Sequence, residues 1–350
     1  NYNAAFGYQT LEQNTTASNN TAFGYQTLEA NTTGTQNVAV GANALDANTT
    51  TNENVAIGYE SLSSALTGGA NVAVGSYALQ DNTAAHNTAV GRMSLLENTS
   101  GTRNTALGSA ALENNTTADD NVAVGYEALM SNTTGYDNTA IGSAALDACT
   151  TGYENVAVGK GAGSSLTTAN SLCAVGFEAA LNTTVSDITA FGHKALRANT
   201  TGNNNTALGR KAMEALTTGD NNTAVGGLSL QTATTANHNT CIGYQSGRRI
   251  TTAQRNTLMG VQAGEDITTA ENNTAVGADA LKELTTGADN TAVGREALQY
   301  CTTGYHNTAV GQEAMKLTTT GHSNTAVGHD ALKDNTTGFV NTAVGQSCGQ

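Results

Sequence analysis

A single glycine that returns every 17 residues constrains this chain more than any other feature. It occurs 21 times, from Gly7 to Gly345, and the interval is 17 residues except at two places where it is 16. Around this glycine the repeat reads N-T/V-A-V-G-x-x-A-L-x-x-N-T-T-G-x-x. A fixed period of this length indicates a solenoid, in which equivalent residues of successive repeats stack in space. We therefore expect 1–350 to be one repeat solenoid.

The segment before the glycine is short, rich in β-branched residues and bounded by Asn and Gly, which predicts a β-strand. Strand alternation places the Thr/Val column and the apolar column before the glycine on one face, and Ala on the other. We expect the apolar column to form the core. The Ala column must then face a close neighbour, either another wall of the same coil or another chain. The repeat columns are represented by Asn37, Ala39, Val40, Gly41, Asn54, Ala56, Ile57, Gly58, Asn121, Ala123, Val124, Gly125, Asn138, Ala140, Ile141 and Gly142.

The stretch after the glycine, such as Glu296-Ala-Leu-Gln, consists of good helix formers and does not alternate as a strand should. It predicts a single helical turn, with a bent second strand as the alternative. The Asn-Thr-Thr-Gly stretch predicts a corner. The expected fold is thus an all-β parallel β-solenoid or β-roll of 21 repeats, with a short helical turn in each repeat.

Departures from the repeat also carry information. Gly163, Gly247 and Gly264 replace the usual Leu, and an apolar residue follows three positions later in each case. A packed core requires such compensation. The two short repeats are expected to lose one residue near a corner, around 84–86 and around 180–182, because corners tolerate deletion better than strands.

The formal net charge is −14, and this acidic balance argues against binding to nucleic acid or to an anionic membrane surface. No apolar run approaches the roughly 20 residues of a membrane-spanning helix. Because the chain begins at Asn1 rather than Met, we interpret it as an internal piece of a longer or processed polypeptide.

The residues that could carry chemistry are scattered. The six His do not recur as a column, and the five Cys are too widely spaced for a disulfide framework. Acidic pairs such as Asp119-Asp120 and Glu265-Asp266 leave a corner-bound ion as an alternative to solvated surface charge. The Asn-Thr-Thr corners match a glycosylation pattern at Asn14, Asn31, Asn48 and Asn132, but a stacked Asn/Thr ladder is the preferred interpretation. We expect no catalytic residue, no metal and no cofactor.

Segments such as Asn37-Val-Ala-Val-Gly41 and Asn138-Thr-Ala-Ile-Gly142 resemble the S-V-A-I-G core of trimeric autotransporter adhesin heads. The whole repeat is similar to arrays in phage tail-fibre-like proteins. This resemblance implies a homotrimer, and the small Ala column would suit close approach of three chains.

The resulting functional expectation is a non-enzymatic fibre shaft, extracellular or on a virion surface, that projects a receptor-binding tip. Its expected partners are further copies of itself and, through flanking domains, host cell-surface glycans or a receptor. A bacterial surface adhesin or extracellular filament subunit is one alternative. An ice-binding or glycan-binding solenoid is another, since regular Thr arrays on β-solenoids can bind ice.

Overall fold

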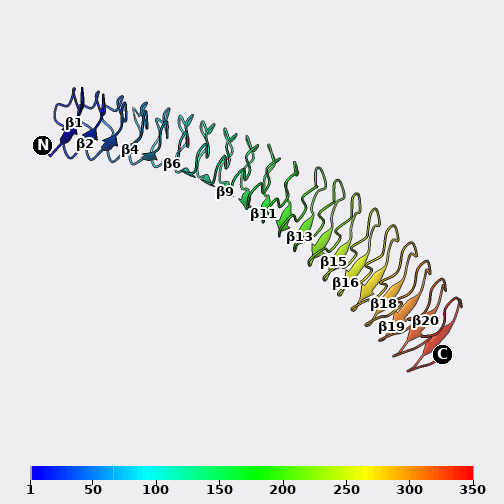
Figure 1. Cartoon of the computed structure of the whole chain (residues 1–350). Coiled ribbons are helices and arrows are strands. Elements are labelled where there is room, and N and C mark those ends of the chain that lie inside the picture. The colour runs from blue at the N-terminus through cyan, green and yellow to red at the C-terminus, as the bar shows by residue number, and fades with distance from the viewer. Residues whose placement is uncertain (1, 66, 350) are drawn as a thin grey trace. The chain divides into compact units, whose positions relative to one another are not determined.

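The structure is a computed structural model that describes residues 2–65 and 67–349. The chain divides into two compact units, Asn1–Leu172 (unit 1) and Cys173–Gln350 (unit 2). Each unit is a parallel β-solenoid in which every coil contributes one three-residue strand. The described residues contain 21 such strands, so the all-β solenoid predicted from the repeat is confirmed (Figure 1).

Within unit 1 the strands of neighbouring coils pair in parallel, and equivalent residues face each other, as Ala39 faces Ala56. The strands are β1 (Ala4–Phe6), β2 (Thr21–Phe23), β3 (Val38–Val40), β4 (Val55–Ile57), β5 (Val72–Val74), β6 (Thr88–Val90), β7 (Thr105–Leu107), β8 (Val122–Val124), β9 (Thr139–Ile141) and β10 (Val156–Val158).

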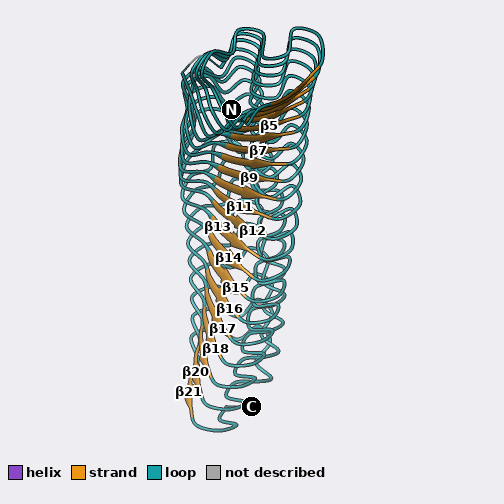
Figure 2. Cartoon of the chain, turned by 90° about the vertical axis from the view of Figure 1, so that its left-hand side faces the viewer, coloured by secondary structure: helices purple, strands orange, loops and turns teal. Residues whose placement is uncertain are grey.

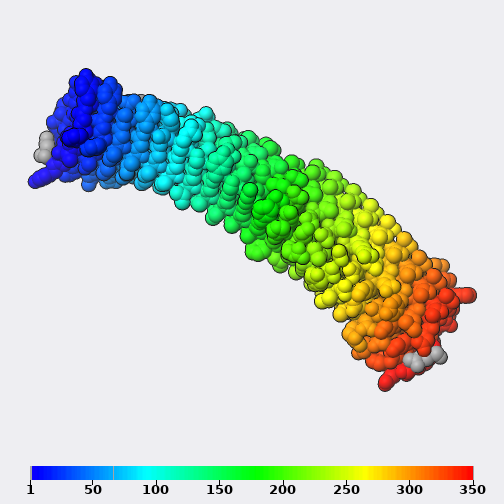
Figure 3. Space-filling model, in the orientation of Figure 1, coloured from blue at the N-terminus to red at the C-terminus, as the bar shows by residue number. Residues whose placement is uncertain are grey.

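Unit 2 repeats the arrangement with the same register, so that Ala292 faces Ala309. Its strands are β11 (Cys173–Val175), β12 (Thr189–Phe191), β13 (Thr206–Leu208), β14 (Thr223–Val225), β15 (Thr240–Ile242), β16 (Thr257–Met259), β17 (Thr274–Val276), β18 (Thr291–Val293), β19 (Thr308–Val310), β20 (Thr325–Val327) and β21 (Thr342–Val344). In each unit the coils follow one another in chain order (Figure 3).

The helical turn predicted after the glycine is wrong, and so is the bent second strand. Within 2–65 and 67–349 the structure has no helix, and turns and loops complete each coil outside its strand (Figure 2). Two residues of this stretch adopt left-handed backbone conformations, for example Glu127 with φ of 55° and Leu129 with φ of 50°. A left-handed residue cannot continue a right-handed helix. The residues of this stretch are therefore selected for packing in the core or for exposure at the surface. Their preference for helix does not determine the backbone conformation.

The orientation of the strand reverses the expectation for the core. Ala39, Ala56 and Ala123 are completely buried, so the Ala column points into the coil and the other walls of the same coil pack against it. The Thr/Val column and the apolar column before the glycine point outward. Ile57 and Ile141 are 39% and 40% exposed, and the prediction that this column forms the core is wrong.

The core consists of the inward Ala column and the Leu column four residues after the glycine. Where Gly replaces Leu, a larger side chain from a neighbouring column fills the space that the Leu side chain would occupy. A Cβ on Gly247 would meet Cys241 Sγ at 2.8 Å and Ile250 Cδ1 at 3.0 Å. Likewise, a Cβ on Gly264 would meet Ile267 Cδ1 at 2.8 Å. The predicted shift of the core filler is confirmed at Gly247 and Gly264, and the Cys in the Ala column belongs to the same compensation. At Gly163 the space is filled by Leu172, whose Cδ2 would lie 2.6 Å from an added Cβ, instead of by the predicted residue three positions later.

The glycine that marks the repeat is required by both conformation and space. Gly125 has a φ of 140°, which residues with a side chain rarely adopt. A Cβ there would lie 2.6 Å from the carbonyl carbon and oxygen of Gly142 in the next coil. Because the obstacle is backbone, no rotation of a side chain can relieve it.

The two short coils both lose their residue at the corner. The first deletion falls around 84–86, as predicted. In the second, the Thr183 amide donates to the Ala180 carbonyl at 3.2 Å, matching the bond from Asn199 to Leu196 in the next coil. Thr183 therefore occupies the corner Asn column, and the missing residue lies between it and Ile188 rather than around 180–182. The Asn182-Thr-Thr sequence imitates the repeat one position too early.

Candidate functional surfaces

The asparagine before each strand forms a buried ladder, which we call the strand Asn ladder. Asn121 shows its pattern in full. Its backbone N–H donates to Asn104 Oδ1 at 3.0 Å, and its own Oδ1 accepts from the backbone N–H of Asn138 at 3.0 Å. Its Nδ2 donates to the Gly135 carbonyl at 2.8 Å. Asn37, Asn54, Asn121 and Asn138 are all completely buried, so this column supplies polar links between coils inside the solenoid.

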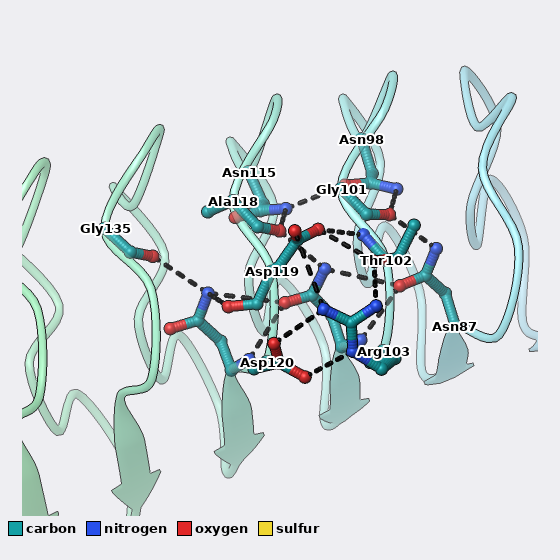
Figure 4. Close-up of polar contacts among 12 residues, drawn as sticks. Asn87, Asn98, Gly101, Thr102, Arg103, Asn115, Ala118, Asp119, Asp120 and Gly135 are labelled. Carbon is teal, nitrogen blue, oxygen red and sulfur yellow. Dashed lines mark hydrogen bonds and ion pairs between the residues drawn. The ribbon is translucent and has the colours of Figure 1, made fainter.

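A second ladder, the corner Asn ladder, runs through the asparagine of the Asn-Thr-Thr corner in unit 1. Asn115 Nδ2 donates to Asn98 Oδ1 at 2.7 Å. The two ladders converge, because the Gly101 carbonyl accepts from Asn98 at 2.9 Å and from Asn87 of the strand Asn ladder at 2.7 Å (Figure 4). In unit 2 this column is mostly apolar, as at Leu216, and these side chains are also buried.

This burial decides between the two interpretations of the Asn-Thr-Thr corners. Asn31, Asn48 and Asn132 are completely buried, and their side-chain nitrogens donate to Gly34, Thr51 and Gly135 carbonyls respectively. An attached glycan needs that nitrogen and an open path to solvent. The ladder interpretation is confirmed for these three residues, whereas Asn14 is only half-buried.

The two threonines of the corner differ in role. The first donates its hydroxyl to the backbone carbonyl of the equivalent Thr in the next coil, as Thr116 Oγ1 does to Thr133 at 3.0 Å. The second, such as Thr117 or Thr134, is exposed and makes no such link. The first Thr column therefore stabilises the stack, and the second presents a row of free hydroxyl and methyl groups.

Both acidic pairs singled out in the sequence are held by arginines of the preceding coil. Arg103 Nε lies 2.7 Å from Asp120 Oδ1, while Asp119 Oδ1 accepts from the backbone N–H and hydroxyl of Thr102 at 2.6 and 2.9 Å (Figure 4). The Arg103 guanidinium lowers the pKa of Asp120.

In the second acidic pair, in unit 2, each carboxylate lies near its own arginine. Arg248 lies 3.4 Å from Glu265, and Arg249 lies 3.0 Å from Asp266. In both pairs, charge links adjacent coils.

Two of the histidines lie against the same tyrosine, since His306 and His322 both contact the Tyr305 ring. His322 stacks between Tyr305 and Phe339, with ring centroids 4.7 and 5.2 Å apart. Burial raises the pKa of the Cys149 and Cys301 thiols to about 11. Among the described residues there is no group of three or more His, Cys, Asp or Glu arranged to hold a metal ion.

The feature that sequence reasoning missed is the exposed apolar face of the strands. In every coil the residue before the glycine points outward, and the Thr/Val column lies beside it on the same face. Large members of this face are well exposed, including Leu107, Phe191 and Leu208 at 47, 50 and 44%. A three-residue strand alternates in the same way whichever side faces inward, so alternation alone could not reveal this face.

Comparison with known proteins adds no identity. No family model matches the chain, and no curated protein matches it significantly. In the described part of the chain, the structure shows no helix with the length and apolar character needed to cross a membrane.

Proposed function

We propose that this chain is a non-enzymatic structural shaft, a segment of an elongated extracellular or virion-surface appendage that projects a receptor-binding tip. The observation that carries the proposal is the continuity of coil-to-coil bonding within each unit. Backbone pairing, the strand Asn ladder and the first Thr column all join equivalent residues of adjacent coils. Because each repeat contacts mainly its neighbours, copies add length without changing the cross-section.

The polar groups that could have carried chemistry have structural partners in this arrangement. The asparagines bond between coils, and both acidic pairs contact arginine. This supports a mechanical role over a catalytic one. A phage tail-fibre-like appendage is the favoured setting, because the whole repeat resembles such arrays. A bacterial surface adhesin or filament subunit is the alternative.

As part of this proposal the shaft is a homotrimer, and host cell-surface glycans or a receptor are contacted through flanking domains. Light scattering on the purified chain tests the assembly. A mass of about three times 35.5 kDa supports the trimer, whereas the mass of one chain at micromolar concentration rejects it. Electron microscopy of appendages labelled with an antibody to this chain tests whether the chain belongs to a surface appendage. The proposal predicts that the label lies along a shaft.

Ice binding is a second candidate, and the exposed second Thr column favours it. The column runs through consecutive coils of unit 2, including Thr286, Thr303 and Thr320. The spacing between coils is about 4.8 Å, as in any β-ladder. Thermal hysteresis in a freezing-point measurement would support this function, and its absence at millimolar protein would reject it.

A further inference from the structure

The outward face of the strands, which we call the outer face, is uncharged throughout the chain. It consists of the residue before each repeat glycine and the residue two positions earlier, which is two side chains in each of 21 coils. None of these 42 side chains is charged, although the chain contains 42 Asp, Glu, Lys and Arg residues. Strand propensity lowers the frequency of Asp, Glu and Lys, but the absence of any charged residue from both columns goes beyond such a depletion.

The outer face is also apolar enough to favour burial. Val293 and Val310 are each 37% exposed, and the bulkier Phe191 is 50% exposed. In five coils both outward residues are aliphatic, as with Val55 and Ile57 in β4. Contiguous exposed apolar surface of this kind marks an interaction site. The Val residues that replace Thr also interrupt any regular hydroxyl array, which disfavours ice as the occupant.

The size of the outer face fits a protein partner. A three-residue strand is about 10 Å long and strands are about 4.8 Å apart, so the ten strands of unit 1 present roughly 500 Å². The eleven strands of unit 2 present about as much. Two copies that covered these faces would bury roughly 2,000 Å², which lies within the range of specific stable interfaces.

The periodicity of the face identifies the partner as another copy of this chain. Matching one outer face over many coils requires a partner whose own side chains repeat at the same spacing. The outer face itself meets that requirement. The net charge of −14 makes copies repel one another, and the uncharged face is where that repulsion opposes approach least.

The amino-acid composition of single coils indicates the register in which two copies of the chain pack against each other. Bulky residues before the glycine, such as Phe23, Leu107 and Met259, always occur with Ala or Thr two positions earlier. Where Val occupies the earlier position, as in Val38 and Val122, the residue before the glycine is Val or Ile. A Phe, Leu or Met before the glycine and a Val two positions earlier thus never occur in the same coil, which limits the apolar surface of each coil. A partner that packs coil against like coil imposes this constraint, whereas a staggered or reversed partner would relate different coils.

We propose that the outer face binds the outer faces of other copies of this chain, parallel to it and with like coils in register. This inference rests on the self-assembly included in the proposed function. It assigns the interface to the outward columns and not to the Ala column, whose members fill the interior of their own coil.

Charged substitutions test the face in the full-length chain. The face variant replaces four valines of equal exposure by Lys, and the control variant replaces four exposed second-column threonines of the same region by Lys. The face positions are Val276, Val293, Val310 and Val327, and the control positions are Thr269, Thr286, Thr303 and Thr320. Both variants add the same charge, and circular dichroism verifies that each keeps its β-structure.

The expected result is that the face variant has the mass of one chain, with association at least a hundred-fold weaker, while the control keeps the mass of the assembled protein. If wild type and face variant assemble equally well, the assignment of the face is wrong and the shaft proposal stands. If wild type itself has the mass of one chain, the self-assembly in the proposed function fails together with this inference.

Spin labels test the register. Val310→Cys in a Cys173→Ser/Cys348→Ser background places one label per chain on the outer face. Parallel, in-register copies bring equivalent labels together across the interface, whose sheets lie about 10 Å apart. The same label at Thr303→Cys, on the corner of the same coil, should give a longer distance. A distance at Val310 as long as that at Thr303 would overturn the proposed packing.

Discussion

The strand Asn ladder should contribute strongly to stability, and Asn121→Ala tests this. The substitution removes Oδ1, which accepts from the Asn138 backbone N–H at 3.0 Å, and Nδ2, which donates to the Gly135 carbonyl at 2.8 Å. The Asn138 backbone N–H would then lie buried without its partner, whereas the Gly135 carbonyl still accepts from Asn132 Nδ2 at 2.9 Å. An unsatisfied buried polar group costs about 1–3 kcal/mol. We therefore expect the local free energy of unfolding to fall by about 2–4 kcal/mol, which combines one unsatisfied buried group with the small void left by the amide.

Native-state hydrogen exchange is the appropriate assay, because the stability of a solenoid is approximately a sum over neighbouring coils. In the Asn121→Ala chain, the amide of Asn138 and those of the adjacent strands β8 and β9 should exchange at least about thirty-fold faster, since about 1.4 kcal/mol corresponds to a factor of ten. The matched control is Thr117→Ala, which alters an exposed side chain of the preceding corner and should change stability by less than about 0.5 kcal/mol.

The contrary result is equally informative. A local loss below about 1 kcal/mol in Asn121→Ala would mean that water or a neighbouring side chain replaces the ladder at little cost. The ladder would then be a consequence of the fold rather than a cause of its stability.

Three further predictions concern other columns. Gly226→Ala should destabilise unit 2 by about 3 kcal/mol or more in urea unfolding, because its Cβ would lie 2.6 Å from the Gly243 carbonyl carbon at a φ of 131°. The neighbouring Gly227→Ala, whose Cβ would come no nearer than 3.5 Å to Tyr244, should change stability by less than about 1 kcal/mol. Equal losses would contradict the steric argument. At pH 8 the folded chain should react with a maleimide at exposed Cys348 but not at Cys149, whose thiol is buried with a pKa of about 11; rapid labelling of Cys149 would show that the core opens. Burial and neighbouring carboxylates raise the pKa of Asp46. Its contribution to stability is therefore greatest below pH 3.8, the unfolded value, and falls as the pH rises through the folded pKa. Asp46→Asn should flatten the loss of stability between pH 4 and 7, and an unchanged pH profile would refute this.

The period and the registration of the columns could be predicted from sequence because they depend on repetition alone. A residue that recurs every 17 positions must stack on its equivalents whatever the local backbone, and the pairing of Ala39 with Ala56 follows. The compensation at Gly247 and Gly264 could be foreseen for the same reason, since a packed interior requires constant volume.

Features that depend on the backbone within one coil could not be predicted. Leu129 in a left-handed conformation contradicts its usual preference and pays roughly 1–2 kcal/mol. Only the fixed positions of the neighbouring coils impose that conformation. The inward direction of Ala was missed because larger residues are normally assigned to the core, whereas here the interior behind the strand admits only a small side chain beside Leu.

The bonding between coils has a consequence for how such proteins change in evolution. The same pattern of links between adjacent coils recurs at every repeat, so removal of one complete repeat would bring together two surfaces that already match. Duplication would insert a coil in the same way. Unequal recombination between nearly identical gene segments could therefore lengthen or shorten the shaft in steps of about 4.8 Å, each step leaving the stack intact. Selection could then adjust the length of the shaft through the number of repeats, independently of the chemistry at the receptor-binding tip.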